Sequence, residues 1–151
     1  MKLSITKITG LILGVIGSLI FAASSSPFNA YPGEYSAKLI RVETTNIIHI
    51  TADVWSGYPK SVRITLPGIV VPQADPKAKA CHALLMQKGL EFTQKYMTDA
   101  KEIKVKDIYM ENTGEIDGIA NIYTDSGSLV TALLNKGFAR SSSIDKNKPW
   151  C

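Results

Sequence analysis

Alternation of apolar and polar residues dominates the part of the chain that follows residue 34. Residues 35–42 have strand composition, and in residues 46–54 the alternation defines one apolar and one more polar face. Residues 61–66 have strand character again after a turn at residues 56–59, which contains Gly57. Three consecutive strands joined by short turns predict a β-meander.

A helical period follows the third strand and predicts one long helix. Asp75 is placed to cap its N-terminus and Pro76 to occupy its first turn, and the pattern continues to about residue 97. The apolar stripe expected to face the core consists of Cys81, Leu84, Leu85, Phe92 and Tyr96.

Two further strands and a short helix complete the pattern. We expect strands at residues 101–109 and 116–124, joined by a turn at residues 112–114. Residues 125–127 are expected to cap a helix that ends at Gly137. The residues expected to face inward from this helix are Leu129, Leu133 and Leu134. The order predicts a mainly β domain: a five-stranded OB-fold barrel with a long helix after the third strand and a short C-terminal helix.

Residues 1–25 have the pattern of an export signal. A positively charged start precedes residues 8–23, which carry no charge, and small residues then offer a cleavage site after Ser24 or Ser25. The uncharged run of about 16 residues is shorter than the roughly 20 that span a bilayer, although an uncleaved N-terminal anchor stays open. We therefore expect a periplasmic or secreted domain, held at the inner membrane if the segment is retained.

The rest of the chain is a single domain of ordinary charge. Residues 26–34 are rich in Ser, Pro and Gly and predict a linker, which leaves residues 35–151 for the domain. The net charge of +4 overstates its basicity, because Lys2 and Lys7 belong to the export segment. Without these two, the 17 basic residues become 15, against 13 acidic ones. This balance excludes a strongly basic protein that coats nucleic acid.

Cysteine use agrees with export. The chain has two cysteines, Cys81 and Cys151, and an exported domain with an even number normally pairs them. Closing so long a loop contributes on the order of 4 kcal/mol in the chain-entropy model. A metal–thiolate site fails on ligand count, since the two histidines, His49 and His82, do not have ligand spacing.

Three segments carry a family resemblance. Residues 118–123 and 133–140 are similar to a "G-L-A-x-V/I-x … L-x-x-G-L-A-R" motif, and residues 62–72 are similar to "V-R-L-x-G-I-D-x-P-E". Residues 148–151, Lys-Pro-Trp-Cys, are similar to the ending of one branch of the same family. On these motifs the chain from about residue 37 to residue 151 resembles the staphylococcal-nuclease-like (thermonuclease) domains. The similar branch is bacterial and exported, with a Cys in the long helix and a C-terminal Trp-Cys.

The resemblance implies calcium-dependent phosphodiester hydrolysis, for which this chain lacks most of the residues. In the family two acidic residues hold the metal, a Glu assists the attacking water, and two arginines stabilise the phosphate. The first arginine is kept as Arg63. With a two-residue insertion placed near Pro67, the other positions hold Thr45 and Val70 for the metal-binding acids, Gln73 for the Glu and Asp117 for the second arginine.

Each replacement removes a different part of the mechanism. Calcium needs several oxygen ligands, preferably carboxylates, and an amide such as Gln73 cannot take a proton. A carboxylate in place of an arginine repels the anionic charge that develops on a phosphate. The resemblance therefore implies an inactive domain that needs no cofactor and acts as a binding or structural module of the cell envelope. Its partner is left open: an envelope protein, nucleic acid on weaker support, and membrane only through the N-terminal segment.

Two alternatives stay open at this point. An active DNA or RNA phosphodiesterase would need Ca²⁺ at a displaced site, with candidate ligands Glu43, Asp53, Asp75 and Asp117. Arg63 would contact phosphate in a binding role, or pair with a carboxylate such as Asp117 in a structural one. The aromatic residues that offer stacking on a ligand are Trp55, Tyr58 and Tyr109, for which packing on the barrel is the favoured expectation.

Overall fold

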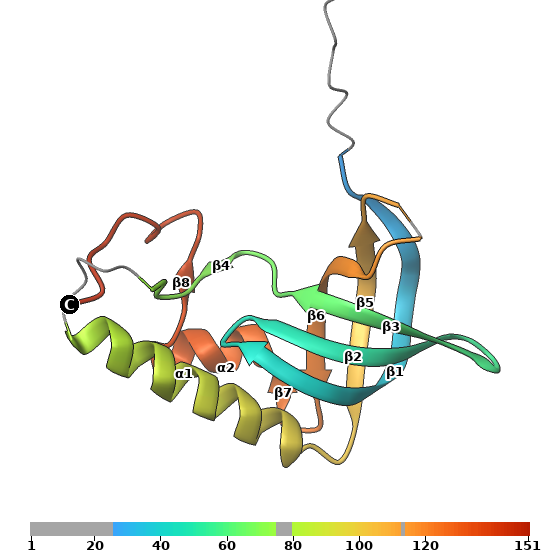
Figure 1. The fold of residues 1–151 in the computed structure, drawn as a ribbon, viewed down its shortest axis with the longest axis horizontal. Coiled ribbons are helices and arrows are strands. Elements are labelled where there is room, and N and C mark those ends of the chain that lie inside the picture. The colour runs from blue at the N-terminus through green and yellow to red at the C-terminus, as the bar shows by residue number, and fades with distance from the viewer. Residues whose placement is uncertain (1–25, 75–79, 113) are drawn as a thin grey trace, which may run out of the picture.

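The computed structural model describes residues 26–74, 80–112 and 114–151, and it is mainly β with two helices (Figure 1). In chain order the elements are β1 (Phe28–Thr44), β2 (Ile47–Trp55), β3 (Tyr58–Thr65), β4 (Ile69–Val70), α1 (Ala80–Thr98), β5 (Ile103–Met110), β6 (Asp117–Thr124), β7 (Gly127–Ser128), α2 (Leu129–Lys136) and β8 (Arg140–Ser141). The expected export segment and the expected helix start at Asp75 lie outside the described residues.

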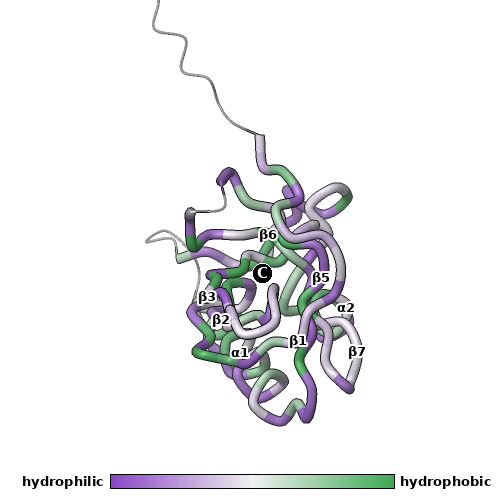
Figure 2. The backbone as a smooth tube through the Cα atoms, turned by 90° about the vertical axis from the view of Figure 1, so that its right-hand side faces the viewer, coloured by the Kyte–Doolittle hydropathy of each residue, from purple (hydrophilic) through white to green (hydrophobic). Residues whose placement is uncertain are grey.

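The five long strands form a closed ring. In the main sheet the strand order is β3-β2-β1-β5-β6-β7, and a further pairing of β3 with β6 joins its two sides. This closing pair is parallel and aligns Arg63 with Asp117, whereas the other pairs are antiparallel. Figure 2 shows the strands around the interior, with hydrophobic and hydrophilic segments succeeding one another along them. The mainly β architecture with a helix between the third and fourth long strands is confirmed.

The core comes from the inward faces of the long strands. Alternation along β2 buries every second side chain, as predicted, and β3, β5 and β6 add their own inward residues. The fully buried strand residues are Ile48, Ile50, Val62, Ile64, Val105, Ile108, Met110 and Ile122. The polar residues that alternate with these buried residues along each strand therefore lie on the outer surface.

Strand β1 is longer than the sequence pattern predicted. Residues 28–34, expected to be a linker, form its first part and pair with β5. Register shifts on either side of Tyr31 accommodate this stretch, and Gly33 adopts φ +107°. The Gly33 N–H donates to Asp107 Oδ1 at 2.8 Å, where Asp107 itself has φ +51°. The composition suggested a linker because it includes residues that interrupt a regular hydrogen-bond ladder. Bulges of this kind let a strand contain such residues.

Helix α1 packs on the barrel through a narrower face than predicted. Its buried residues are Gly89, Thr93 and Met97, spaced four apart. Thr93 Oγ1 donates to the Thr45 carbonyl at 2.9 Å, so the helix rests on the turn between β1 and β2. Leu84, expected in the inward stripe, is 51% exposed, because the packed face is set by close backbone approach rather than by large apolar residues.

Helix α2 has the predicted end but a different start. Gly137 closes it in the left-handed conformation, as expected. Ser128, not residues 125–127, is the N-cap, and its side chain accepts from Thr131 N. Asp125 instead accepts from Lys101 N at 2.8 Å. Leu134, expected inward, is 38% exposed, whereas Leu129 and Leu133 are buried.

The C-terminal segment is fastened at several points. The predicted Cys81–Cys151 disulfide joins it to α1. Strands β4 and β8 pair, an arrangement that no sequence pattern indicated. The Arg140 guanidinium lies 4.2 Å from the centroid of the Trp150 ring and donates to the Lys148 carbonyl. In the described part of the chain, no helix is long and apolar enough to cross a membrane.

Replacing Gly89 tests the close approach of α1. A Cβ at this position would lie 2.7 Å from Thr45 Oγ1 and 3.0 Å from Thr45 Cγ2. Overpacking costs typically 1–3 kcal/mol, against the roughly 1 kcal/mol by which Ala favours a helix over Gly. We expect Gly89→Ala to destabilise the protein by about 1 kcal/mol, and the same change in a Thr45→Ala background to stabilise it, since the clashing atoms are gone. Urea unfolding of the four proteins measures this, and equal effects of Gly89→Ala in both backgrounds contradict it.

The disulfide is expected to stabilise the fold substantially. Its cysteines are 70 residues apart, a separation for which the chain-entropy model gives about 4 kcal/mol. The double variant Cys81→Ser/Cys151→Ser should therefore unfold at clearly lower urea than the oxidised protein. The control is the oxidised protein against the same sample after reduction, which should match the variant. A coincident unfolding curve for oxidised and reduced protein rules this contribution out.

Candidate functional site

A charged cluster occupies the outer face of β1, β2, β3 and β6. The register places Arg63 beside His49 across the β2–β3 pair and beside Asp117 across the closing β3–β6 pair. His49 in turn stands beside Arg41 of β1. The inward partners of these positions fill the core, so the alternation of the strands forces the charged side chains outward.

Arg63 is the centre of this cluster, and three of its nitrogens have partners. Its Nε and Nη2 donate to the two carboxylate oxygens of Glu43, at 3.0 and 2.8 Å. Its Nη1 donates to Asp117 Oδ1 at 3.0 Å. The Arg63 side chain is 29% exposed, so these bonds are partly shielded from water. Such a bidentate arrangement is the strongest geometry available to an arginine–carboxylate pair.

Glu43 has two further partners. His49 Nε2 lies 2.6 Å from Glu43 Oε2, and Arg41 Nη2 approaches the same oxygen at 3.4 Å. The hydrogen bonds from Arg63 and His49 lower the pKa of Glu43 from 4.5 to about 2. The hydrogen bonds that Arg63 donates to Glu43 and Asp117 raise the pKa of Arg63 above its ordinary value. Both groups are therefore charged and engaged with each other throughout the neutral range.

The pairing of Arg63 with Asp117, considered for a structural role of Arg63, is present. Glu43 was considered only as a possible metal ligand, and its bidentate bond to Arg63 was not anticipated. The residues are 20 positions apart in sequence, and their contact depends on the β1–β2–β3 register. The outward position of His49 in the alternating second strand was the one available indication of a polar group at this place.

Of the other family positions, Thr45 and Gln73 line one cleft, whereas Asp117 contacts Arg63. A cleft of about 420 Å³ lies between the β1–β2 turn, α1 and the segment after β4, with Glu43, Thr45 and Gln73 among its lining residues. The Thr45 side chain is buried against Gly89. Gln73 Nε2 donates to the Val71 carbonyl at 3.3 Å. Val70 pairs with Arg140 in the small sheet.

These residues do not fit the calcium ion that the resemblance implies. Val70 has no side-chain donor, the Thr45 side chain packs against α1, and both oxygens of Glu43 are bonded to Arg63. Asp117, the other considered ligand within this cluster, is also bonded to Arg63, and Asp75 lies outside the described residues. Within residues 26–74, 80–112 and 114–151, no group of three or more His, Cys, Asp or Glu residues is arranged to hold a metal ion.

Two of the three aromatic candidates are largely exposed to solvent. Trp55 and Tyr58 are cross-strand partners at the tip of the β2–β3 hairpin, 70% and 73% exposed. Gly57 makes the tight turn between them with φ +81°. Figure 1 shows this hairpin extending beyond the rest of the barrel. The expectation that they pack on the barrel is wrong for both, because the end of the hairpin extends past the strands that would cover it. Tyr109, on β5, is 41% exposed.

Comparison with known proteins identifies no family. No family model matches the chain, and a search of curated proteins finds no significant match. The geometry of the described residues therefore has to support any functional assignment.

The low pKa of Glu43 predicts a definite pH dependence. Because this pKa falls from 4.5 to about 2 on folding, its ion pairs stabilise the protein fully above about pH 4.5, and this contribution is lost as the pH falls through about 2. Glu43→Gln should lower the melting temperature at pH 5, and the gap to the unmodified protein should close as the pH falls from 4.5 to 2. Melting curves across this range measure it.

The matched control for this measurement is Glu111→Gln. Glu111 is exposed and has no ion-pair partner in the described part of the chain. This variant should melt close to the unmodified protein throughout. A melting gap for Glu43→Gln that stays constant down to pH 2 would contradict the account of the cluster.

Proposed function

We propose that this chain is an exported, nuclease-like OB-fold domain that has lost catalysis and acts as a binding or structural module in the cell envelope. The ring of five strands with a helix between the third and fourth agrees with an OB-fold barrel. The Cys81–Cys151 disulfide agrees with an oxidising compartment. The family motifs of residues 118–123 and 133–140 support the same assignment.

One observation carries the loss of catalysis: the guanidinium of Arg63 is already bound. Three of its nitrogens donate to Glu43 and Asp117. A phosphate that approached Arg63 would have to displace a carboxylate and would meet the negative charges of both acids. Catalytic donors have to be aimed at the position where charge develops, with no rearrangement at the moment of reaction. Arg63 therefore supports the structure of the barrel instead of binding a transition state.

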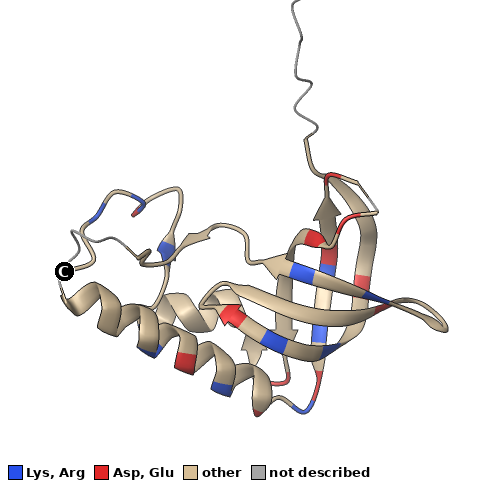
Figure 3. Cartoon of the chain, in the orientation of Figure 1, with Lys and Arg blue, Asp and Glu red and all other residues tan. Residues whose placement is uncertain are grey.

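The distribution of charge favours a protein partner over nucleic acid. Acidic and basic positions both occur over the barrel strands (Figure 3): β1 and β5 carry both signs, and Arg63 of β3 is paired with Glu43 and Asp117. Nucleic-acid binding draws most of its affinity from concentrated positive charge. The exposed Trp55 and Tyr58 at the hairpin tip are residues of the type that anchor protein interfaces. We infer that the β2–β3 hairpin is the contact point of the module.

A cleavage assay tests the loss of catalysis. The purified, oxidised protein is incubated with single- and double-stranded DNA and with RNA, first with Ca²⁺ and then with EDTA. We expect no calcium-dependent cleavage, because the described residues offer neither a calcium ligand set nor a free phosphate clamp. Arg63→Ala is the control variant. Calcium-dependent cleavage by the unmodified protein that Arg63→Ala abolishes would overturn the proposal.

A further inference from the structure

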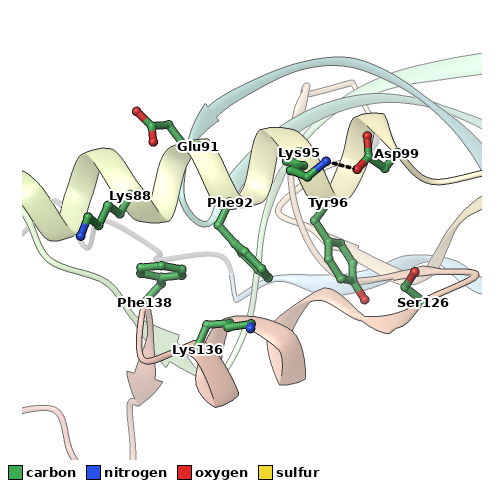
Figure 4. Close-up of a pocket in the computed structure, with 9 residues that line it drawn as sticks. All are labelled: Lys88, Glu91, Phe92, Lys95, Tyr96, Asp99, Ser126, Lys136 and Phe138. Carbon is green, nitrogen blue, oxygen red and sulfur yellow. Dashed lines mark hydrogen bonds and ion pairs between the residues drawn. The ribbon is translucent and has the colours of Figure 1, made fainter.

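A second cleft lies on the other side of α1, between α1 and α2, away from the charged cluster. Its volume is about 570 Å³, within the range of roughly 300–1,000 Å³ that is common for small-molecule sites. Its lining comes from α1 and the residue that follows it, from the last residue of α2, from Phe138 after α2, and from the turn before β7. The lining residues are Lys88, Glu91, Phe92, Lys95, Tyr96, Asp99, Ser126, Lys136 and Phe138 (Figure 4).

Three aromatic rings give this cleft an apolar wall. Phe92 lies between the other two, with ring centroids 5.7 Å from Tyr96 and 5.4 Å from Phe138. Figure 4 shows Phe92 and Tyr96 pointing from α1 towards α2, with Phe138 facing them from beyond α2. Rings at these distances make a stable, preformed surface against which an apolar body can pack.

Several polar groups of the cleft lining lack partners. The Tyr96 hydroxyl is buried and has no hydrogen-bond partner among the described residues. A buried hydroxyl without a partner costs free energy that a ligand oxygen would recover. Lys88 and Lys136 have no ion-pair partner in the described residues, and Figure 4 shows the Lys136 side chain lying along the cleft beneath Phe92.

The acidic residues of the lining do not neutralise Lys136. Asp99 pairs with Lys95 at 2.6 Å. Glu91 accepts from Gln87 Nε2, and Figure 4 shows it pointing away from α2. Lys136 lies in the last turn of α2, where its positive charge stabilises the C-terminal end of the helix dipole. This structural role accounts for Lys136, but it explains neither the unpartnered Tyr96 hydroxyl nor the open aromatic wall.

We propose that the α1–α2 cleft binds an amphipathic monocarboxylate, an apolar chain or ring that ends in one carboxylate. The apolar body packs on Phe92 and Phe138, and the carboxylate accepts from Lys136 Nζ and from the Tyr96 hydroxyl. The lining carries three lysines, Lys88, Lys95 and Lys136, against two carboxylates, Glu91 and Asp99, and this excess of one positive charge matches one negative charge on the ligand. The aromatic wall disfavours a ligand that is polar throughout. This inference is independent of the proposed loss of nuclease activity, since the two sites share no residue.

Titration with three ten-carbon probes tests the proposal: decanoate, decan-1-ol and decylamine. Binding is followed by calorimetry and by NMR shifts of the Phe92 and Phe138 rings. We expect decanoate to bind about tenfold more tightly than decanol, because only the carboxylate forms a charge-assisted hydrogen bond with Lys136, and decylamine to bind most weakly.

Variants assign the effect to named side chains. Lys136→Gln should weaken decanoate binding about tenfold and leave decanol unchanged, and Tyr96→Phe should weaken decanoate by a smaller factor. Lys106→Gln, at an exposed position of β5 away from the cleft, is the matched control and should leave the affinity for each probe unchanged. Decanoate binding that Lys136→Gln leaves unchanged, equal affinity for the three probes, or the absence of ring shifts at Phe92 and Phe138 would each overturn the proposal.

Discussion

The ion-pair cluster around Arg63 is the interaction on which the rest of the account depends. Arg63 lies on β3 at the seam where the ring closes, and its backbone N–H donates to the Ile116 carbonyl at 2.7 Å. Its side chain reaches Glu43 of β1 on one side and Asp117 of β6 on the other. One guanidinium therefore links three strands of the barrel. Removing one partner of such a partly shielded network costs more than the pair contributes, because the remaining charge is left unbalanced.

The same interaction underlies the proposal that a nuclease-like barrel has lost its catalytic site. An arginine that binds phosphate needs donors directed at an open space, and its carboxylate neighbours would hold a metal ion. Here both carboxylates accept hydrogen bonds from the arginine itself. Asp117, at the position where the resemblance expects a second arginine, supplies a partner for Nη1.

Local sequence pattern predicted most elements of this fold and little of the site. Alternation identified β2 with its buried Ile48 and Ile50, and Gly137 marked the end of α2, because both depend on local backbone preference. The first part of β1 was missed because bulges compensate for its Gly33. The packed face of α1 was misjudged because it depends on the missing side chain of Gly89 facing Thr45. The Glu43–Arg63 contact needs the three-strand register, which no local window contains.

Arg63 itself provides the most direct test of the central claim, through the NMR resonance of its Nε–H group. If the guanidinium is held by Glu43 and Asp117, this resonance should exchange slowly with water and keep its position when a DNA oligonucleotide and Ca²⁺ are added together. Glu43→Gln should accelerate the exchange, since Nε donates to Glu43 Oε2. A resonance that shifts on addition of the oligonucleotide with Ca²⁺ would show that Arg63 binds phosphate, and would contradict the account.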